Sequence, residues 1–199
     1  MRSYSGTSRK AEFNPYYPRI QKNEKFAGYG WFYVPSWNLS IGAPAKAGSS
    51  SLKHHMTVSD VDCKYILQKQ IPKSSDVYFV VRDPYERFMS LWKSKCRDER
   101  AIADKDVHGL SPHALMAHIS SGKRDVHWTP QANLIKGLQN VNLIPLENLN
   151  EWWSDRGYGE LEIVNPTEGG MEIDETIRAW LRDFYAEDFI LYSQACASE

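Results

Sequence analysis

The chain has 199 residues, of which 42% are hydrophobic and 25% are charged, and its formal net charge is −1. This length favours a single domain over residues 1–199 with a full core, and the composition is that of an ordinary soluble globular protein. A net charge near zero excludes a general attraction to nucleic acid or to an anionic membrane. Any site for an anion must therefore be built locally.

The three cysteines, Cys63, Cys96 and Cys196, are odd in number and far apart in the sequence. They show no CxxC or Cys/His spacing typical of a metal site, so we expect free thiols in a reducing compartment. The chain has no signal-peptide pattern at its start and no apolar run of about 18 residues. These features predict a cytoplasmic protein without a metal ion or a membrane span.

In chain order, prolines and glycines break up residues 1–30, which predicts an irregular N-terminal arm. The stretch "WNLSIGAP" (37–44) predicts a strand, and serines then open a predicted helix at 49–56. A further helix is expected over 59–70. The stretch "DVYFVVRD" (76–83) holds a continuous apolar run, which is typical of a strand buried on both faces in a parallel sheet.

The stretch "DPYERFMSLWKSK" (83–95) predicts a helix with Asp83 as its N-cap, Pro84 at the first position and Glu86 in a capping-box pattern. Its apolar residues recur at helical spacing and form one face. The remaining pattern predicts further elements in this order: a helix at 111–122, a strand at 140–146, a helix from 147, and a helix at 174–195.

This order of strands and helices predicts an α/β fold with a central parallel sheet flanked by helices. Ligands of such folds bind outside the carboxyl ends of the strands. Two stretches of interest, 44–51 and 82–84, follow predicted strands directly. We therefore expect both at the ligand-binding edge.

The first stretch, "AKAGSSSL" (45–52), combines Lys46 and Gly48 with three serines at a helix start. Glycine lets backbone N–H groups turn toward a ligand, and a helix N-terminus favours an anion. The stretch can therefore cradle a phosphate or a sulfate. It lacks the Gly-Lys-Ser/Thr end of a Walker A loop, and a Ser/Gly-rich connector is the alternative interpretation.

The second stretch places Arg82 at the end of a buried strand and Ser90 two turns into the following helix. A guanidinium fork and a hydroxyl can bind a second phosphate. The alternative interpretation pairs Arg82 with Asp83 or Glu86.

Together, "AKAGSSSL" and "VVRDPYERFMSLWKSK" resemble the two donor-binding motifs of the sulfotransferases that use 3′-phosphoadenosine-5′-phosphosulfate (PAPS). Other segments resemble the carbohydrate branch of that family, which includes the chondroitin, dermatan and heparan sulfotransferases. They are "DVHWTPQANLI" (125–135), "IPLENLNEWW" (144–153), "VNPT" (164–167) and "FYAEDFILY" (184–192). The resemblance covers about residues 37 to 195.

The resemblance implies a P-loop-like nucleotide-binding fold and sulfuryl transfer from PAPS to a hydroxyl, most often on a saccharide or glycoconjugate, without a metal ion. It implies that Lys46 stabilises the leaving group and that Arg82 and Ser90 bind the 3′-phosphate. The residues implied for the 5′-phosphosulfate are Lys46, Ala47, Gly48, Ser49, Ser50 and Ser51.

The general base is open between His127, His54 and His55, with His127 first because it lies in the motif-like stretch "HWTPQ". Two departures from the family pattern stand out: Ala45 separates Pro44 from Lys46, and the stretch "NPTEGGMEI" is acidic where many relatives are basic. A nucleotide kinase or phosphotransferase of related fold, or a non-catalytic PAPS-binding module, are the alternative functions.

Overall fold

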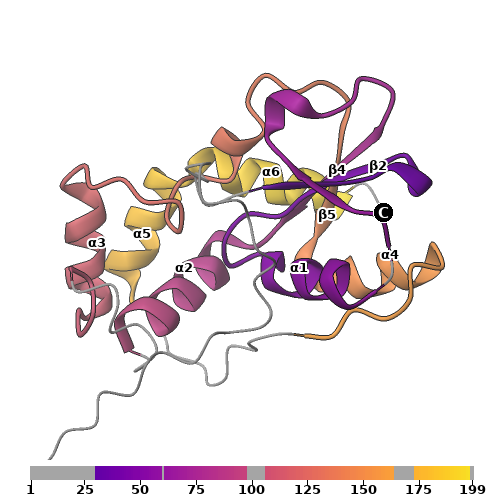
Figure 1. Cartoon of the computed structure of the whole chain (residues 1–199). Coiled ribbons are helices and arrows are strands. Elements are labelled where there is room, and N and C mark those ends of the chain that lie inside the picture. Colours follow the sequence, from indigo (N-terminus) through magenta and orange to yellow (C-terminus); the bar gives the residue numbers. More distant parts are fainter. Residues whose placement is uncertain (1–29, 60, 98–105, 164–172, 198–199) are drawn as a thin grey trace, which may run out of the picture.

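The computed structural model describes residues 30–59, 61–97, 106–163 and 173–197. These residues form a sheet with helices on both faces (Figure 1), so the predicted α/β fold is confirmed. The predicted N-terminal arm, apart from Gly30, lies outside the described residues, and so does the segment 164–167.

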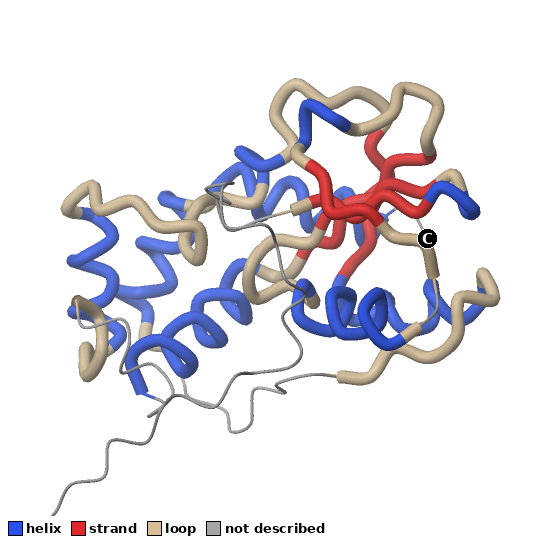
Figure 2. Tube along the Cα trace, in the orientation of Figure 1, coloured by secondary structure: helices blue, strands red, loops and turns tan. Residues whose placement is uncertain are grey.

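The sheet, red in Figure 2, has its five strands in the order β3–β1–β2–β4–β5. Strands β2, β4 and β5 run parallel to one another, whereas β1 is antiparallel to both of its neighbours. The strands are β1 Trp31–Val34, β2 Leu39–Gly42, β3 Lys64–Ile66, β4 Asp76–Val81 and β5 Val141–Pro145.

The sheet is therefore mixed, which corrects the expectation of a wholly parallel one. Strands β1 and β2 are joined only by the 3₁₀ turn η1, Pro35–Trp37, and by Asn38 in the left-handed region at φ 48°. A connection this short joins antiparallel neighbours, because parallel strands need a crossover of about a dozen residues or more. The strand β1 itself was not predicted.

The segment 59–70 is not a helix, contrary to the prediction. It contains β3 and the 3₁₀ helix η2, Gln68–Gln70. Strand β3 pairs with β1, and the Tyr65 ring lies edge-on to Phe32 with 5.3 Å between centroids. The edge of β1 offers hydrogen bonds to this segment, and such tertiary pairing overrides local propensity.

Two predicted helices differ in extent from the observed ones. Helix α2 continues as a π-helical segment, η3 Lys93–Arg97, and the C-terminal helix divides at Tyr185 into α5 and α6. The α-helices of the described ranges are α1 Ser49–Val58, α2 Pro84–Trp92, α3 Pro112–Ser120, α4 Leu149–Asp155, α5 Glu175–Phe184 and α6 Ala186–Ala197.

Helices cover both faces of the sheet around β4. Val80 belongs to a core cluster with Leu52 of α1 and Trp153 of α4, whereas Phe79 belongs to a cluster with Leu191 of α6. Successive strand residues point to opposite faces, so a strand covered on both sides must be apolar throughout. This burial explains the continuous apolar run in the sequence of β4.

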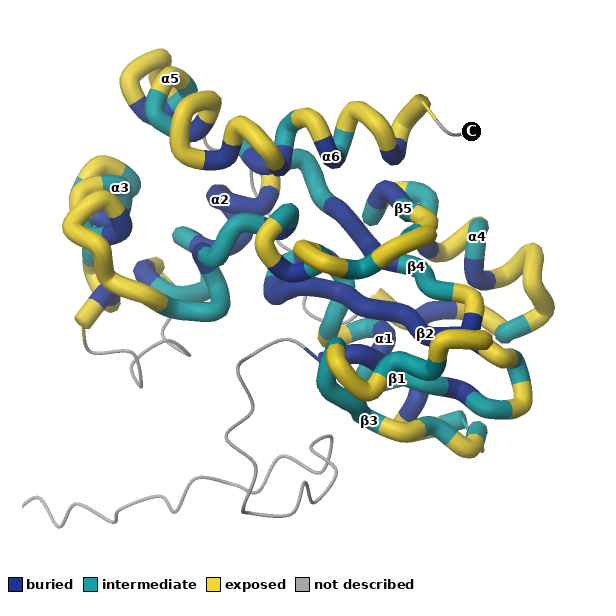
Figure 3. The backbone as a smooth tube through the Cα atoms, turned by 90° about the horizontal axis from the view of Figure 1, so that it is seen from above, coloured by how far each residue is buried: buried dark blue, intermediate teal, exposed yellow. Residues whose placement is uncertain are grey.

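Helices α2, α3 and α5 group beside the sheet and share a third core cluster (Figure 3). The cluster includes Phe88 of α2, Leu115 of α3 and Leu181 of α5, all of them buried. None of the helices within the described part of the chain is long and apolar enough to span a membrane.

Candidate active site

Residues 43–48, here called the donor loop, connect β2 to α1 at the carboxyl end of β2. Lys46 and Gly48 both have positive φ, at 71° and 82°. A Cβ atom on Gly48 would lie 2.9 Å from Leu146 Cδ1 and 3.0 Å from Leu149 Cδ2. Glycine is therefore required here both by the backbone conformation and by the packing of the chain that follows β5.

The donor loop ends at the N-terminus of α1. The N–H of Leu52 donates to the carbonyl of Gly48 at 3.0 Å, so this bond begins the helical pattern. The N–H groups of Ser49 and Ser50 come before this bond, in the first turn of α1. Such N–H groups, with the helix dipole and adjacent hydroxyls, form a site suited to an anion.

Arg82 follows β4 and contacts the donor loop. Its Nη1 donates to the Lys46 carbonyl at 3.0 Å, and its Nη2 lies 3.5 Å from Glu86 Oε2. Burial lowers the pKa of Arg82, and the carboxylates of Glu86 and Asp83 oppose this effect. The alternative pairing of Arg82 with Glu86 is therefore observed, whereas its binding of a phosphate remains a prediction.

Ser90 lies on α2 two turns after Arg82 and is buried, with 4% of its surface exposed. It faces the interior of the molecule beside the apolar residues Phe88 and Leu91, which are also buried. Its proposed partnership with Arg82 in phosphate binding remains a prediction from the sequence.

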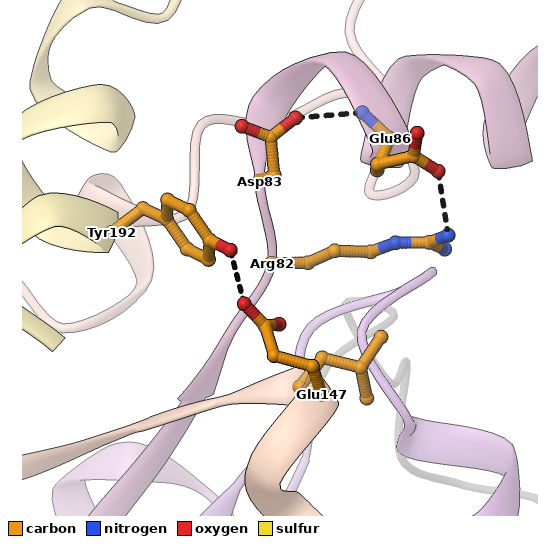
Figure 4. Close-up of a pocket in the computed structure, with 6 residues that line it drawn as sticks. Arg82, Asp83, Glu86, Glu147 and Tyr192 are labelled. Atoms are coloured by element: carbon orange, nitrogen blue, oxygen red, sulfur yellow. Dashed lines mark hydrogen bonds and ion pairs between the residues drawn. The ribbon is translucent and has the colours of Figure 1, made fainter. Parts of the chain in front are cut away.

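A cavity of about 320 Å³ adjoins Arg82, between the ends of β4 and β5 (Figure 4). In it, the hydroxyl of Tyr192 from α6 donates to Glu147, which follows β5. The cavity is lined by Arg82, Asp83, Glu86, Leu146, Glu147 and Tyr192.

His127 lies in residues 125–132, here called the base loop. Its Nδ1 is 2.5 Å from Asp125 Oδ1, and its backbone N–H donates to the same oxygen at 2.8 Å. This carboxylate fixes the imidazole through Nδ1, which leaves Nε2 as the nitrogen for proton transfer. Burial lowers the pKa of His127, the bond to Asp125 raises it, and the charges of Lys95 and Lys46 lower it further.

The other candidate bases make contacts elsewhere. His54 Nε2 is 3.0 Å from Glu162 Oε2, and the His55 ring lies edge-on to Trp153 with 5.2 Å between centroids. The His55 Nε2 atom is buried and has no hydrogen bond among the described residues. Of the three histidines, His127 has both an orienting carboxylate and the charge of Lys46 acting on it.

Three buried polar residues near the site escaped the sequence interpretation: Arg87, Gln131 and Asp188. Gln131 hydrogen-bonds the backbone N–H and carbonyl of Arg82, at 3.0 and 2.8 Å. Asp188 accepts hydrogen bonds from the backbone N–H groups of Gln131 and Ala132, at 2.8 and 2.9 Å. No signal in the sequence marked Arg87, because helical spacing places it on the side of α2 opposite the apolar residues Phe88 and Trp92.

A comparison with protein-family models matches residues 32–153, more than half of the chain, to the model described as the sulfotransferase family. Searches of curated proteins and of solved structures give no significant match. The matched range contains the donor loop, Arg82 and His127, whereas α5 and α6 lie beyond it. The chain therefore belongs to the sulfotransferase family, whose members are transferases that move a sulfuryl group.

Proposed function

We propose that this protein transfers a sulfuryl group from PAPS to a hydroxyl of a saccharide. The proposal is carried by one observation: Arg82 hydrogen-bonds the Lys46 carbonyl, so that a cationic fork adjoins the anion cradle of the donor loop. A donor with a phosphosulfate and a separate phosphate offers two anionic groups, which suits two adjacent cationic sites.

The chemistry of the residues present fits such a donor. Ser49 and Ser50 offer hydroxyl and N–H donors at the start of α1, and Gly48 supplies the left-handed backbone turn that leads into it. Arg82 and Ser90 are the expected partners of the 3′-phosphate. The carboxylate of Glu86 lies at the same guanidinium, so its negative charge opposes a phosphate there.

Sulfuryl transfer, like phosphoryl transfer, depends mainly on positioning and on stabilising charge as it develops. In this proposal the acceptor oxygen forms a bond to sulfur while the bond from sulfur to the phosphate oxygen breaks. Lys46 stabilises the negative charge that develops on that phosphate oxygen. The hydroxyl proton passes to Nε2 of His127, and Asp125 stabilises the resulting imidazolium.

The saccharide acceptor rests on the resemblance of residues 125–135 and 144–153 to the carbohydrate branch. Trp128 and Trp153 of these segments offer no added support, because both are buried in core clusters. Trp152 is half-buried and its ring lies under the Arg156 guanidinium. A broad panel of sugar hydroxyls is therefore the first acceptor screen.

The donor is tested by calorimetric titration with adenosine 3′,5′-bisphosphate, AMP, and ATP with magnesium. We expect selective binding of the bisphosphate, and a loss of about tenfold or more in the Arg82→Ala variant, since a hydrogen bond to a charged group contributes about 1.5–3 kcal/mol. Arg156→Ala is the matched control, because Arg156 lies over the Trp152 ring, outside the donor loop. Equal binding of AMP would contradict the proposal, and magnesium-dependent ATP binding alone would favour a phosphotransferase.

Transfer is tested with Lys46→Ala. We expect this variant to lose sulfuryl transfer while it still binds the bisphosphate, because the lysine acts on charge that develops only in the transition state. Full turnover in Lys46→Ala would contradict the mechanism. Bisphosphate binding by the unmodified protein without transfer to any acceptor would favour a non-catalytic binding module.

A further inference from the structure

Arg87 lies on α2 between the donor loop and the base loop, and only 3% of its surface is exposed. Its Nε donates to the carbonyl of Ala45 at 3.2 Å, in the donor loop. Its Nη2 donates to the carbonyls of His127 at 3.3 Å and Thr129 at 2.9 Å, in the base loop. One planar guanidinium therefore joins the two loops that carry Lys46 and His127.

Asp188 of α6 pairs with the guanidinium of Arg87. Its Oδ2 lies 3.8 Å from Arg87 Nη1, and its carboxylate also accepts the N–H groups of Gln131 and Ala132. Burial raises the pKa of Asp188, while these hydrogen bonds and the charge of Arg87 act against that rise. The base loop is thus attached both to α2 and to α6.

A second connection runs through Gln131, which is fully buried. Its side-chain amide accepts from the backbone N–H of Arg82 and donates to the Arg82 carbonyl. The Arg82 guanidinium in turn donates to the Lys46 carbonyl. The hydrogen bonds of Arg87 and Gln131 therefore reach the donor loop by two routes.

A buried ion pair of this kind is a weak source of stability, because apolar residues of similar volume often stabilise a core as well or better. Apolar residues cannot hold several carbonyls in a fixed arrangement, whereas a guanidinium can, because it offers five donors in a rigid plane. We propose that Arg87 is a positioning residue for sulfuryl transfer, one that fixes the base loop relative to the donor loop. This inference rests on the proposed function.

The first test is the Arg87→Lys variant. Lysine keeps the positive charge facing Asp188, but a single ammonium cannot bond all three loop carbonyls in the same geometry. We expect kcat to fall about 10- to 100-fold, because a displacement of about 1 Å can cost that much. The Kd for adenosine 3′,5′-bisphosphate should change by less than about threefold, since Arg87 binds the loop backbone and is not itself among the proposed ligands.

Arg178→Lys is the matched control. Arg178 also donates from Nε to a carbonyl, that of Ile173 at 3.0 Å, and lies over the Tyr85 ring. It contacts neither loop through these bonds, so we expect unchanged kcat and Kd. An equal loss of kcat in both variants would mean that Arg87 contributes only to general stability.

The second test measures the separation of the loops without any nucleotide or acceptor. The imidazole pKa of His127 is followed by NMR in the unmodified protein, Lys46→Gln, Arg87→Lys and the double variant. Removing the Lys46 charge should raise the pKa of His127, because that charge lowers it. In the Arg87→Lys background the rise should be smaller, because the two loops are no longer held at a fixed distance.

A rise of equal size in both backgrounds would overturn the inference. Arg87→Gln, which keeps an amide donor, replaces Arg87→Lys in the cycle if the lysine variant does not fold. The two proposals fail separately: a protein that does not bind the bisphosphate refutes the proposed donor, whereas the NMR cycle alone still decides the role of Arg87.

Discussion

At the scale of single residues, the basicity of His127 depends on opposing influences. Burial and two lysine charges lower its pKa, whereas the hydrogen bond to Asp125 raises it. Together these influences lower the pKa of His127 below its ordinary value of 6.5. The imidazole is therefore largely neutral at pH 7, which is the form that accepts a proton.

This direction fixes the sign of the pH dependence. We expect kcat to rise with pH through the lowered pKa of His127 and to level off by about pH 7. Asp125→Asn should move the rising limb to still lower pH, because the group that raises the pKa is removed, and should reduce the plateau by about 10²- to 10⁴-fold. The measurement is a pH profile of kcat between about pH 5 and pH 8.

Glu162→Gln supplies the control for that profile, because Glu162 is the partner of His54. We expect Glu162→Gln to leave the pH range over which kcat rises unchanged. A shift of that range in Glu162→Gln, with no shift in Asp125→Asn, would assign the base to His54.

Glu86 is expected to weaken donor binding. It occupies Arg82 in the structure at 3.5 Å, and its side chain is mostly exposed, at 69%. An exposed ion pair contributes about 0.2–1 kcal/mol, so Glu86→Gln should tighten bisphosphate binding by about 1.4- to fivefold in calorimetry. Glu151→Gln, which removes an equal charge from α4, should leave the affinity unchanged. Weaker binding in Glu86→Gln would show that Glu86 assists the donor.

At the scale of elements, the turn from the donor loop into α1 depends on Gly48. Gly122 has nearly the same φ, 84° against 82°, but a Cβ there would meet no atom within 4 Å. Alanine at Gly122 would therefore introduce backbone strain alone, whereas alanine at Gly48 would add crowding to the same strain.

We expect Gly122→Ala to cost about 1–2 kcal/mol of unfolding free energy, from the left-handed conformation alone. Gly48→Ala should cost more, because its Cβ would press on Leu146 and Leu149, and it should also weaken bisphosphate binding. Urea denaturation and calorimetry provide the measurements. Equal costs with unchanged binding would mean that α4 moves aside easily and that the donor loop tolerates a side chain.

At the scale of the whole molecule, helix α6 contacts the candidate site although the family match ends at residue 153. Asp188 of α6 is fully buried and is the carboxylate facing Arg87. Removing one partner of a buried pair leaves the other charge uncompensated.

Asp188→Asn should therefore lower the free energy of unfolding by about 3–5 kcal/mol. Asp183→Asn, an exposed aspartate one helix earlier, should change it by less than about 0.5 kcal/mol. Thermal or urea unfolding measures both. A small effect of Asp188→Asn would indicate that water enters this part of the core.

Local features of the sequence determined much of the fold. The apolar run predicted β4, and Asp83 was predicted as an N-cap, which accepts from the N–H group of Glu86. The apolar run and the cap involve residues within a few positions of one another, so their spacing carries the information. The donor loop and Arg82 were singled out from the sequence by residue type, and their contact spans 36 positions.

Only the tertiary structure decided the direction of β1, the presence of β3, and the connection of the loops through Arg87. The hydrogen bonds of Arg87 to the donor loop and of Asp188 to the base loop join residues 42 and 57 positions apart. No periodicity in the sequence encodes such contacts, because they depend on where the packed helices place each side chain. The sequence thus supplied the chemical groups of the candidate site, and the packing of α2 and α6 decided how they are held together.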